Sequence, residues 1–120
     1  MGVKRKYHYL EVPILNNEYW VYVIWGDKDR CIKFLKKHFE DVYFTEADFD
    51  GIRGKCFSRK GYHPVIYLVD PKHWGTVAHE ACHAVQRIWD YIGEESFGEV
   101  YAASVGAIVR RVSDYLQKGR

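Results

Sequence analysis

Residues 64–92 read PVIYLVDPKHWGTVAHEACHAVQRIWDYI, and the two elements in this stretch decide the rest of the fold. The apolar and β-branched run at 64–69 predicts a strand, which Asp70-Pro71 ends. The apolar spacing that follows predicts a helix that ends near Tyr91. We therefore expect a strand that leads directly into a long amphipathic helix.

Inside this helix, the segment His79-Glu80-Ala81-Cys82-His83 places two histidines four residues apart. Positions i and i+4 of a helix lie on one face, so the two imidazoles can point at one metal ion. Glu80 is offset by about 100° around the helix axis. That offset places its carboxylate beside a metal ion, where it can take a proton from a bound water. The alternative is a helix with two unrelated histidines.

A catalytic zinc site needs a third protein ligand and one open position. Glu99 begins a second helical run, predicted over about 97–116, after a turn-like segment at 92–98. We expect the face of Glu99 to contact the first helix, because it continues through small residues that permit close approach: Ala102, Ala103, Gly106 and Ala107. Rival third ligands are Glu94 and Glu95 in the turn and His73 ahead of the helix.

The motif His79-Glu80-x-x-His83, followed by a Glu in the next helix, resembles the gluzincin group of zinc metallopeptidases. The chain is also similar to small HExxH proteins encoded by bacteriophages. The resemblance covers about residues 64–118. It implies a small zincin-like domain with Zn2+ as cofactor and His79, His83 and Glu99 as ligands. Glu80 is then the general base in hydrolysis of a peptide or protein substrate.

In zincin folds the strand before this helix usually lies near the cleft, and its edge pairs with an extended substrate. The resemblance therefore implies a substrate-binding edge over 65–69, with Val65, Ile66 and Tyr67 as substrate-binding residues. The alternative is that this strand is central and buried. Candidates for a second donor to the developing oxyanion are Tyr62, His63 and Tyr101.

The first half of the chain predicts a mostly antiparallel sheet with one helix. Residues 7–14 and 19–25 read as two strands of a hairpin, joined by the turn signal Asn16-Asn17. Asp27 is the expected cap of an amphipathic helix that ends near Phe39. Further expected segments are short strands at 42–44 and 55–59 and a loop at 45–54. With two C-terminal helices carrying the metal site, the expected class is α+β, in one domain spanning 1–120.

Composition and charge argue against some classes of binding partner and cellular location. The net charge of +2 is too small to argue for nucleic acid. No apolar run approaches the ~20 residues that cross a bilayer, and the basic N-terminus lacks the features of a signal peptide. Cys31, Cys56 and Cys82 then read as reduced thiols of a cytoplasmic protein. We expect Cys82 to pack rather than to bind metal.

Two classes of function follow from these residues. The first is a zinc-dependent peptidase. The second is a non-catalytic protein-binding or inhibitory module on a zincin scaffold, in which a phage-encoded protein uses the cleft to bind a host protein. The intact Glu80 favours the enzyme, because a purely structural zinc site needs no general base. Asp70 and Asp90 are the candidates for orienting the imidazoles.

Overall fold

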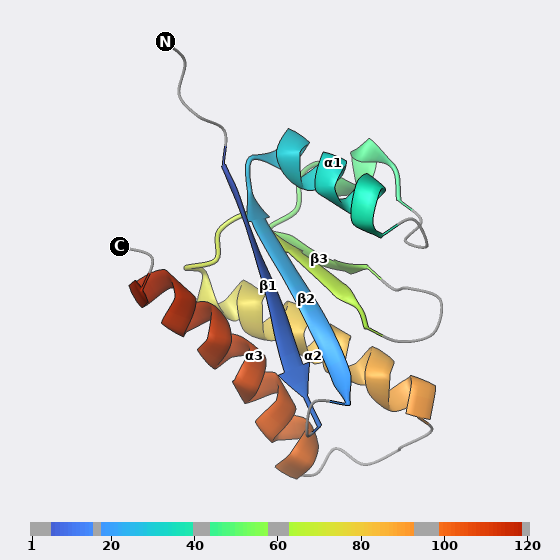
Figure 1. The fold of residues 1–120 in the computed structure, drawn as a ribbon, viewed down its shortest axis with the longest axis vertical. Helices are drawn as coiled ribbons and strands as arrows, with labels where there is room; N and C mark the ends of the chain where they lie inside the picture. The colour runs from blue at the N-terminus through green and yellow to red at the C-terminus, as the bar shows by residue number, and fades with distance from the viewer. Residues whose placement is uncertain (1–5, 16–17, 40–43, 58–62, 93–98, 119–120) are drawn as a thin grey trace.

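The computed structural model describes residues 6–15, 18–39, 44–57, 63–92 and 99–118 of the 120-residue chain (Figure 1). The elements in chain order are strands β1 (Tyr7–Ile14) and β2 (Tyr19–Gly26), helix α1 (Lys28–His38), the short 3-10 helix η1 (Glu46–Phe49), strands β3 (Gly54–Phe57) and β4 (Val65–Leu68), and helices α2 (Trp74–Ile92) and α3 (Glu99–Lys118).

The four strands form one mixed sheet in the order β1-β2-β4-β3. β1 pairs with β2 and β3 pairs with β4 in antiparallel fashion, whereas β2 and β4 are parallel. A parallel pair needs a long crossover connection, and the segment from α1 to β3 supplies it. The expected α+β class, a sheet followed by two C-terminal helices, is confirmed at this level.

Helices cover both faces of the sheet, and each face has its own apolar core (Figure 1). The core on one face joins the sheet to α2 and α3 through Val77, Val85, Ile88, Ile108 and Val112, among others. The core on the other face joins it to α1 through Cys31, Ile32 and Leu35. None of the helices in the described part of the chain is long and apolar enough to span a membrane.

The first half of the chain largely follows its sequence pattern. The hairpin and the helix are confirmed, and the side chain of Asp27 caps α1 by accepting from the N–H of Arg30 at 3.1 Å. The segment expected to be a loop contains η1, so that expectation is wrong there. The turn Asn16-Asn17, residues 42–43 and residues 58–59 lie outside the described residues.

The position of β4 overturns the expected substrate-binding edge. β4 has β2 on one side and β3 on the other, and Val65, Ile66, Tyr67 and Leu68 are all buried. The backbone groups of these residues already pair within the sheet, so they cannot pair with a peptide. Strand addition at 65–69 is therefore wrong, and the central buried strand is what the structure has. The edge strand beyond β4 is β3.

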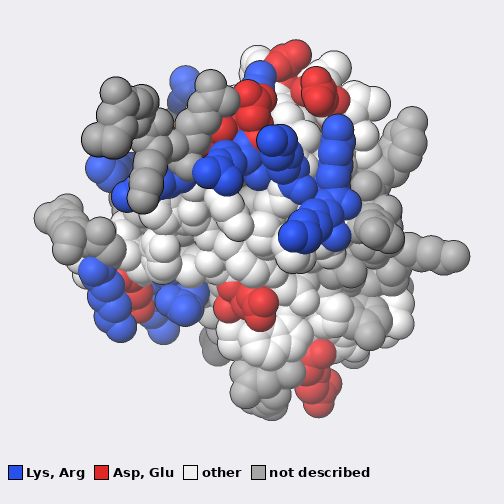
Figure 2. Space-filling view, turned by 45° about the horizontal axis from the view of Figure 1, so that its top comes forward, with Lys and Arg blue, Asp and Glu red and all other residues white. Residues whose placement is uncertain are grey.

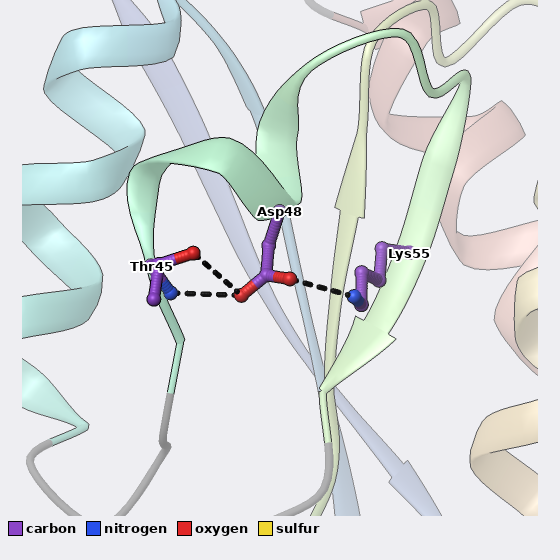
Figure 3. Close-up of polar contacts among 3 residues, drawn as sticks. All are labelled: Thr45, Asp48 and Lys55. Atoms are coloured by element: carbon purple, nitrogen blue, oxygen red, sulfur yellow. Dashed lines mark hydrogen bonds and ion pairs between the residues drawn. The ribbon is translucent and has the colours of Figure 1, made fainter.

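η1 is joined to β3 by the carboxylate of Asp48 (Figure 3). Asp48 Oδ2 accepts from the N–H of Thr45 at 2.8 Å, and Oδ1 accepts from Lys55 Nζ at 3.2 Å. The backbone hydrogen bond from Thr45 and the neighbouring Lys55 hold the pKa of Asp48 below its usual value. The strand at the sheet edge is thus tied to the segment that precedes it.

Charged side chains of both signs share the face drawn in Figure 2, where Lys and Arg gather in the upper part with Asp and Glu beside them. Ion pairs of this kind join the described residues Lys28 and Asp50, and Lys36 and Glu46, at 3.2 and 3.8 Å. Exposed pairs contribute little to stability. They do show that the charges of Lys28 and Lys36 are each balanced by a neighbouring carboxylate.

Candidate metal centre

The imidazoles of His79 and His83 lie side by side on the exposed surface of α2. Their Nε2 atoms are 3.1 Å apart and their ring centroids 4.7 Å apart. Two zinc–nitrogen bonds of about 2.0–2.1 Å at a tetrahedral angle would hold the nitrogens about 3.3 Å apart. The histidine pair therefore fits a zinc ion with only a small adjustment of the rings.

Glu80 is turned inward from this pair and is only 7% exposed. Its Oε2 lies 4.0 Å from Nε2 of His79. The buried carboxylate of Glu80 thus lies next to one histidine of the pair.

Gly54 of β3 makes this position of Glu80 possible. A Cβ atom at Gly54 would lie 2.9 Å from Thr76 Cγ2 and 3.1 Å from Glu80 Cγ. Any side chain there would push α2 away from the strand. α2 therefore approaches the sheet edge closely at the turn that carries the motif.

An open cleft of about 400 Å³ lies between α2 and β3, and we call it the α2–β3 cleft. It is lined by Ile52, Arg53, Gly54, His73, Gly75, Thr76, His79 and Glu80. A smaller hollow of about 180 Å³, lined in part by Val69 and Asp70, shares Arg53 and His73 with it. Glu80 and one histidine of the pair thus line a space that a ligand can enter.

The outer side of β3 borders this cleft, and among the described residues no strand pairs with it. Arg53 O accepts from the N–H of Val69 at 2.9 Å, which marks residues 53 and 69 as facing each other with hydrogen bonds. Antiparallel ladders alternate between bonded and non-bonded pairs. Gly54 and Cys56 therefore direct their N–H and C=O groups outward, away from β4.

His73, a rival candidate for the third metal ligand, has a structural role. It caps α2, because its carbonyl accepts from the N–H of Val77 at 3.1 Å and its Nδ1 lies 2.8 Å from Thr76 Oγ1. Arg53 Nη1 lies 2.8 Å from its Nε2. Its Nδ1 also accepts from the N–H of Thr76 at 3.2 Å, which is the hydrogen bond expected of a helix cap. Both ring nitrogens are thus engaged within the chain.

The proposed third ligand is only partly visible. Glu99 is the first residue of α3, but its side chain and the rivals Glu94 and Glu95 lie outside the described residues. Among the side chains that are described, no three His, Cys, Asp or Glu groups gather closely enough to hold a metal ion. Tyr101 OH donates to Cys82 O at 3.1 Å, so the first turn of α3 lies against the turn of α2 that contains His83.

The expected contact through small residues is wrong. Ala102 and Ala103 are exposed, and a Cβ on Gly106 would meet nothing within 4 Å. α3 instead packs through larger side chains, with Ile108 and Val112 fully buried. The helices are therefore held together by a conventional apolar interface rather than by a close approach at small residues.

The other candidates from the sequence do not converge on the cleft. His63 Nδ1 accepts from the N–H of Trp20 at 2.9 Å, and Tyr101 binds a carbonyl of α2 instead. Tyr62 lies outside the described residues. Among described residues, therefore, these candidates supply no oxyanion donor to the cleft.

The carboxylates and the thiol near the motif also have other roles. Asp90 accepts from Gln86 Nε2 at 2.8 Å, and Asp70 accepts from the N–H of Lys72 at 2.9 Å. Cys82 is exposed, so the expectation that it packs is wrong. Sequence reasoning missed Arg53 and Gly54, whose only signal was a bend-forming Gly-x-x-Gly at 51–54.

No protein-family model, curated protein or solved structure matches the chain. The α2–β3 cleft brings together one histidine of the pair, the buried Glu80 and a strand edge that no described strand pairs with.

Proposed function

We propose that the chain is a zinc-dependent metallopeptidase with a zincin-like fold. The observation that carries the proposal is the placement of Glu80, buried beside the histidine pair and facing a cleft that an edge strand borders. In this proposal His79 and His83 bind Zn2+ and Glu99 is the third ligand. The fit of the two Nε2 atoms to tetrahedral zinc supports the metal.

Glu80 acts as the general base. When bound, zinc would supply a Lewis acid that polarises the peptide carbonyl and acidifies a water. Glu80 takes a proton from the attacking water and returns one to the leaving amine. Its low exposure favours this role, because bulk water is kept from the carboxylate while the cleft side stays open to substrate.

The substrate peptide lies extended along β3. The outward N–H and C=O groups of Gly54 and Cys56 offer it backbone hydrogen bonds, as in other cases of strand addition. Gly54 also lies against Glu80 Cγ, so a peptide paired there passes close to the general base. This assignment replaces the one made to β4.

Support for Glu99 comes from the start of α3. The hydrogen bond from Tyr101 to Cys82 O holds this end of the helix against the turn that carries His83. Glu99 is two residues before Tyr101. A carboxylate from this turn would complete a ligand set of two histidines and one glutamate, as in known catalytic zinc sites.

Metal content tests the ligand set. Elemental mass spectrometry should find about one zinc per chain in the wild type and much less in His79→Ala, His83→Ala and Glu99→Ala. Glu94→Ala and Glu95→Ala are matched controls that should retain zinc. A wild type that stays free of zinc after zinc has been supplied and the excess removed would sink the proposal. If Glu99→Ala kept the zinc content of the wild type, a residue other than Glu99 would be the third ligand.

Cleavage of a peptide library tests the chemistry. Glu80→Gln should keep its zinc and lose about 10²–10⁴-fold in kcat/KM, the usual contribution of a general base. Asp90→Asn changes a carboxylate on the same helix that binds Gln86 and should leave the rate unchanged. A non-catalytic binding module would cleave nothing, and its zinc and partner binding would be indifferent to Glu80→Gln.

A further inference from the structure

Among the residues that the structure describes, Arg53 at one end of the cleft has no carboxylate partner. Its side chain is exposed, it lines both the α2–β3 cleft and the smaller hollow beside it, and among the described residues it forms no ion pair. Its guanidinium Nη1 lies 2.8 Å from His73 Nε2. A guanidinium has five N–H donors, so most of its donors remain available to a ligand.

The guanidinium is also held in place. His73 is fixed by its bond to the Thr76 hydroxyl and by its cap on α2. The backbone of Arg53 is anchored by its hydrogen bond to Val69, the residue that follows β4. Because both ends of the side chain are positioned, Arg53 loses little conformational freedom when it binds an anion.

The direction of β3 fixes which part of a substrate meets Arg53. Arg53 lies at His73, Gly54 lies against Glu80, and the Cys56 thiol lies beside the Arg87 guanidinium. β3 and α2 therefore run in the same direction along the cleft. A peptide that pairs antiparallel to β3, the more stable mode, has its C-terminal part at Arg53.

We propose that Arg53 binds a substrate carboxylate on the C-terminal side of the scissile bond, a preference that rests on the proposed peptidase function. His73 and Glu80 are seven residues apart on α2, which at 1.5 Å per residue is about 10 Å, or roughly three residues of extended peptide. The carboxylate thus belongs to about the third residue after the cleaved bond. It is either an Asp or Glu side chain or the free C-terminus.

The test uses a peptide that the wild-type zinc enzyme cleaves, in two matched pairs. One pair is amidated and differs by Glu against Gln at the third residue after the bond. The other pair ends at that residue with a free carboxylate or an amide. We expect about a 10- to 100-fold higher kcat/KM for the carboxylate member of at least one pair. The pair that shows the preference identifies the source of the carboxylate.

Two variants decide whether Arg53 is responsible. Arg53→Gln should remove the preference and keep activity on the uncharged peptides. Lys72→Gln removes a positive charge from the same end of α2 without touching either hollow, and it should keep the preference. Equal rates within both pairs for the wild type, or a preference that survives Arg53→Gln, would overturn the assignment.

A binding measurement separates this assignment from the proposed function. If the wild type cleaves no peptide, the peptidase proposal fails, and fluorescence anisotropy then decides the anion site. The probes are two labelled alanine-based hexapeptide amides that differ by one Glu against Gln. Tighter binding of the Glu probe to wild type, lost in Arg53→Gln, supports Arg53 as a carboxylate receptor. Equal affinity of the two probes for the wild type rejects it.

Discussion

At Gly54, the lack of a side chain sets the distance between the sheet edge and α2. We expect Gly54→Ala to destabilise the protein by about 1–3 kcal/mol, because its Cβ would press on Thr76, Glu80 and the Tyr67 carbonyl. This exceeds the gain of about 0.4–1 kcal/mol from a less flexible unfolded chain. Urea denaturation measures the difference.

The same substitution in open space is the matched control for Gly54→Ala. A Cβ at Gly106, inside α3, meets nothing within 4 Å. Gly106→Ala should therefore raise the free energy of unfolding by about 0.5–1 kcal/mol through helix propensity. If both variants were equally stable, steric contact at Gly54 would not be the reason that the position holds glycine.

Residue by residue, the sequence predicted the parts of the site that are local. The spacing of His79, Glu80 and His83 within one helix was enough to place them together. The pairing of Arg53 with His73 joins residues 20 apart in the chain, through a bend that no periodicity describes. Such contacts depend on how β3 sits beside α2, which no local pattern specifies.

At the scale of elements, η1 and β3 depend on one carboxylate. The pKa of Asp48 is lowered in the folded protein, chiefly by the Thr45 backbone hydrogen bond and then by Lys55. Its stabilising contribution is therefore present above the unfolded-chain pKa of about 3.9 and is lost as the pH falls through the lower folded-state value.

This linkage predicts how Asp48→Asn changes acid unfolding. The variant should be less stable than the wild type at neutral pH, and the two should converge as the pH falls below about 4. Lys55→Met leaves the bond from Thr45 and should keep most of the pH dependence. Unfolding midpoints measured across pH check both. A constant gap between wild type and Asp48→Asn at all pH values would contradict the linkage.

The order of the strands was the main feature that sequence reasoning did not supply. Val65 to Leu68 form an unbroken apolar run, which is typical of a strand buried on both faces. The central position was therefore one of the two alternatives that the sequence left open, and the edge was implied only by the resemblance to zincin folds. β3 has only four residues, one of them glycine, so its pattern was too short to identify it as the edge.

In the whole molecule, each face of the sheet has one buried cysteine thiol, and the reactivity of these thiols measures whether that face is folded. Cys31 lies in the core under α1 and Cys56 in the core under α2 and α3. Burial raises the pKa of each to about 12, against the opposing effect of Arg87 at Cys56. Native protein at pH 8 should therefore react with iodoacetamide only at the exposed Cys82.

Urea should expose the two buried thiols together. If residues 1–120 form one cooperative domain, Cys31 and Cys56 become reactive at the same urea concentration. Pulse labelling followed by peptide mass spectrometry resolves the two sites, with Cys82→Ser as the control for the fast-reacting thiol. A thiol that reacts well before the other would show that one face of the sheet unfolds independently.

The cleft and the histidine pair come from one uninterrupted stretch of chain, residues 52–83. The hairpin of β1 and β2 and helix α1 support this stretch from the far side of β4 and from the opposite face. Substitutions in the first fifty residues should therefore change how much active protein a cell accumulates. Substitutions of exposed side chains within the stretch, such as Arg53, His79 and His83, should instead change what each folded molecule can do, so a mutational scan would separate these two effects.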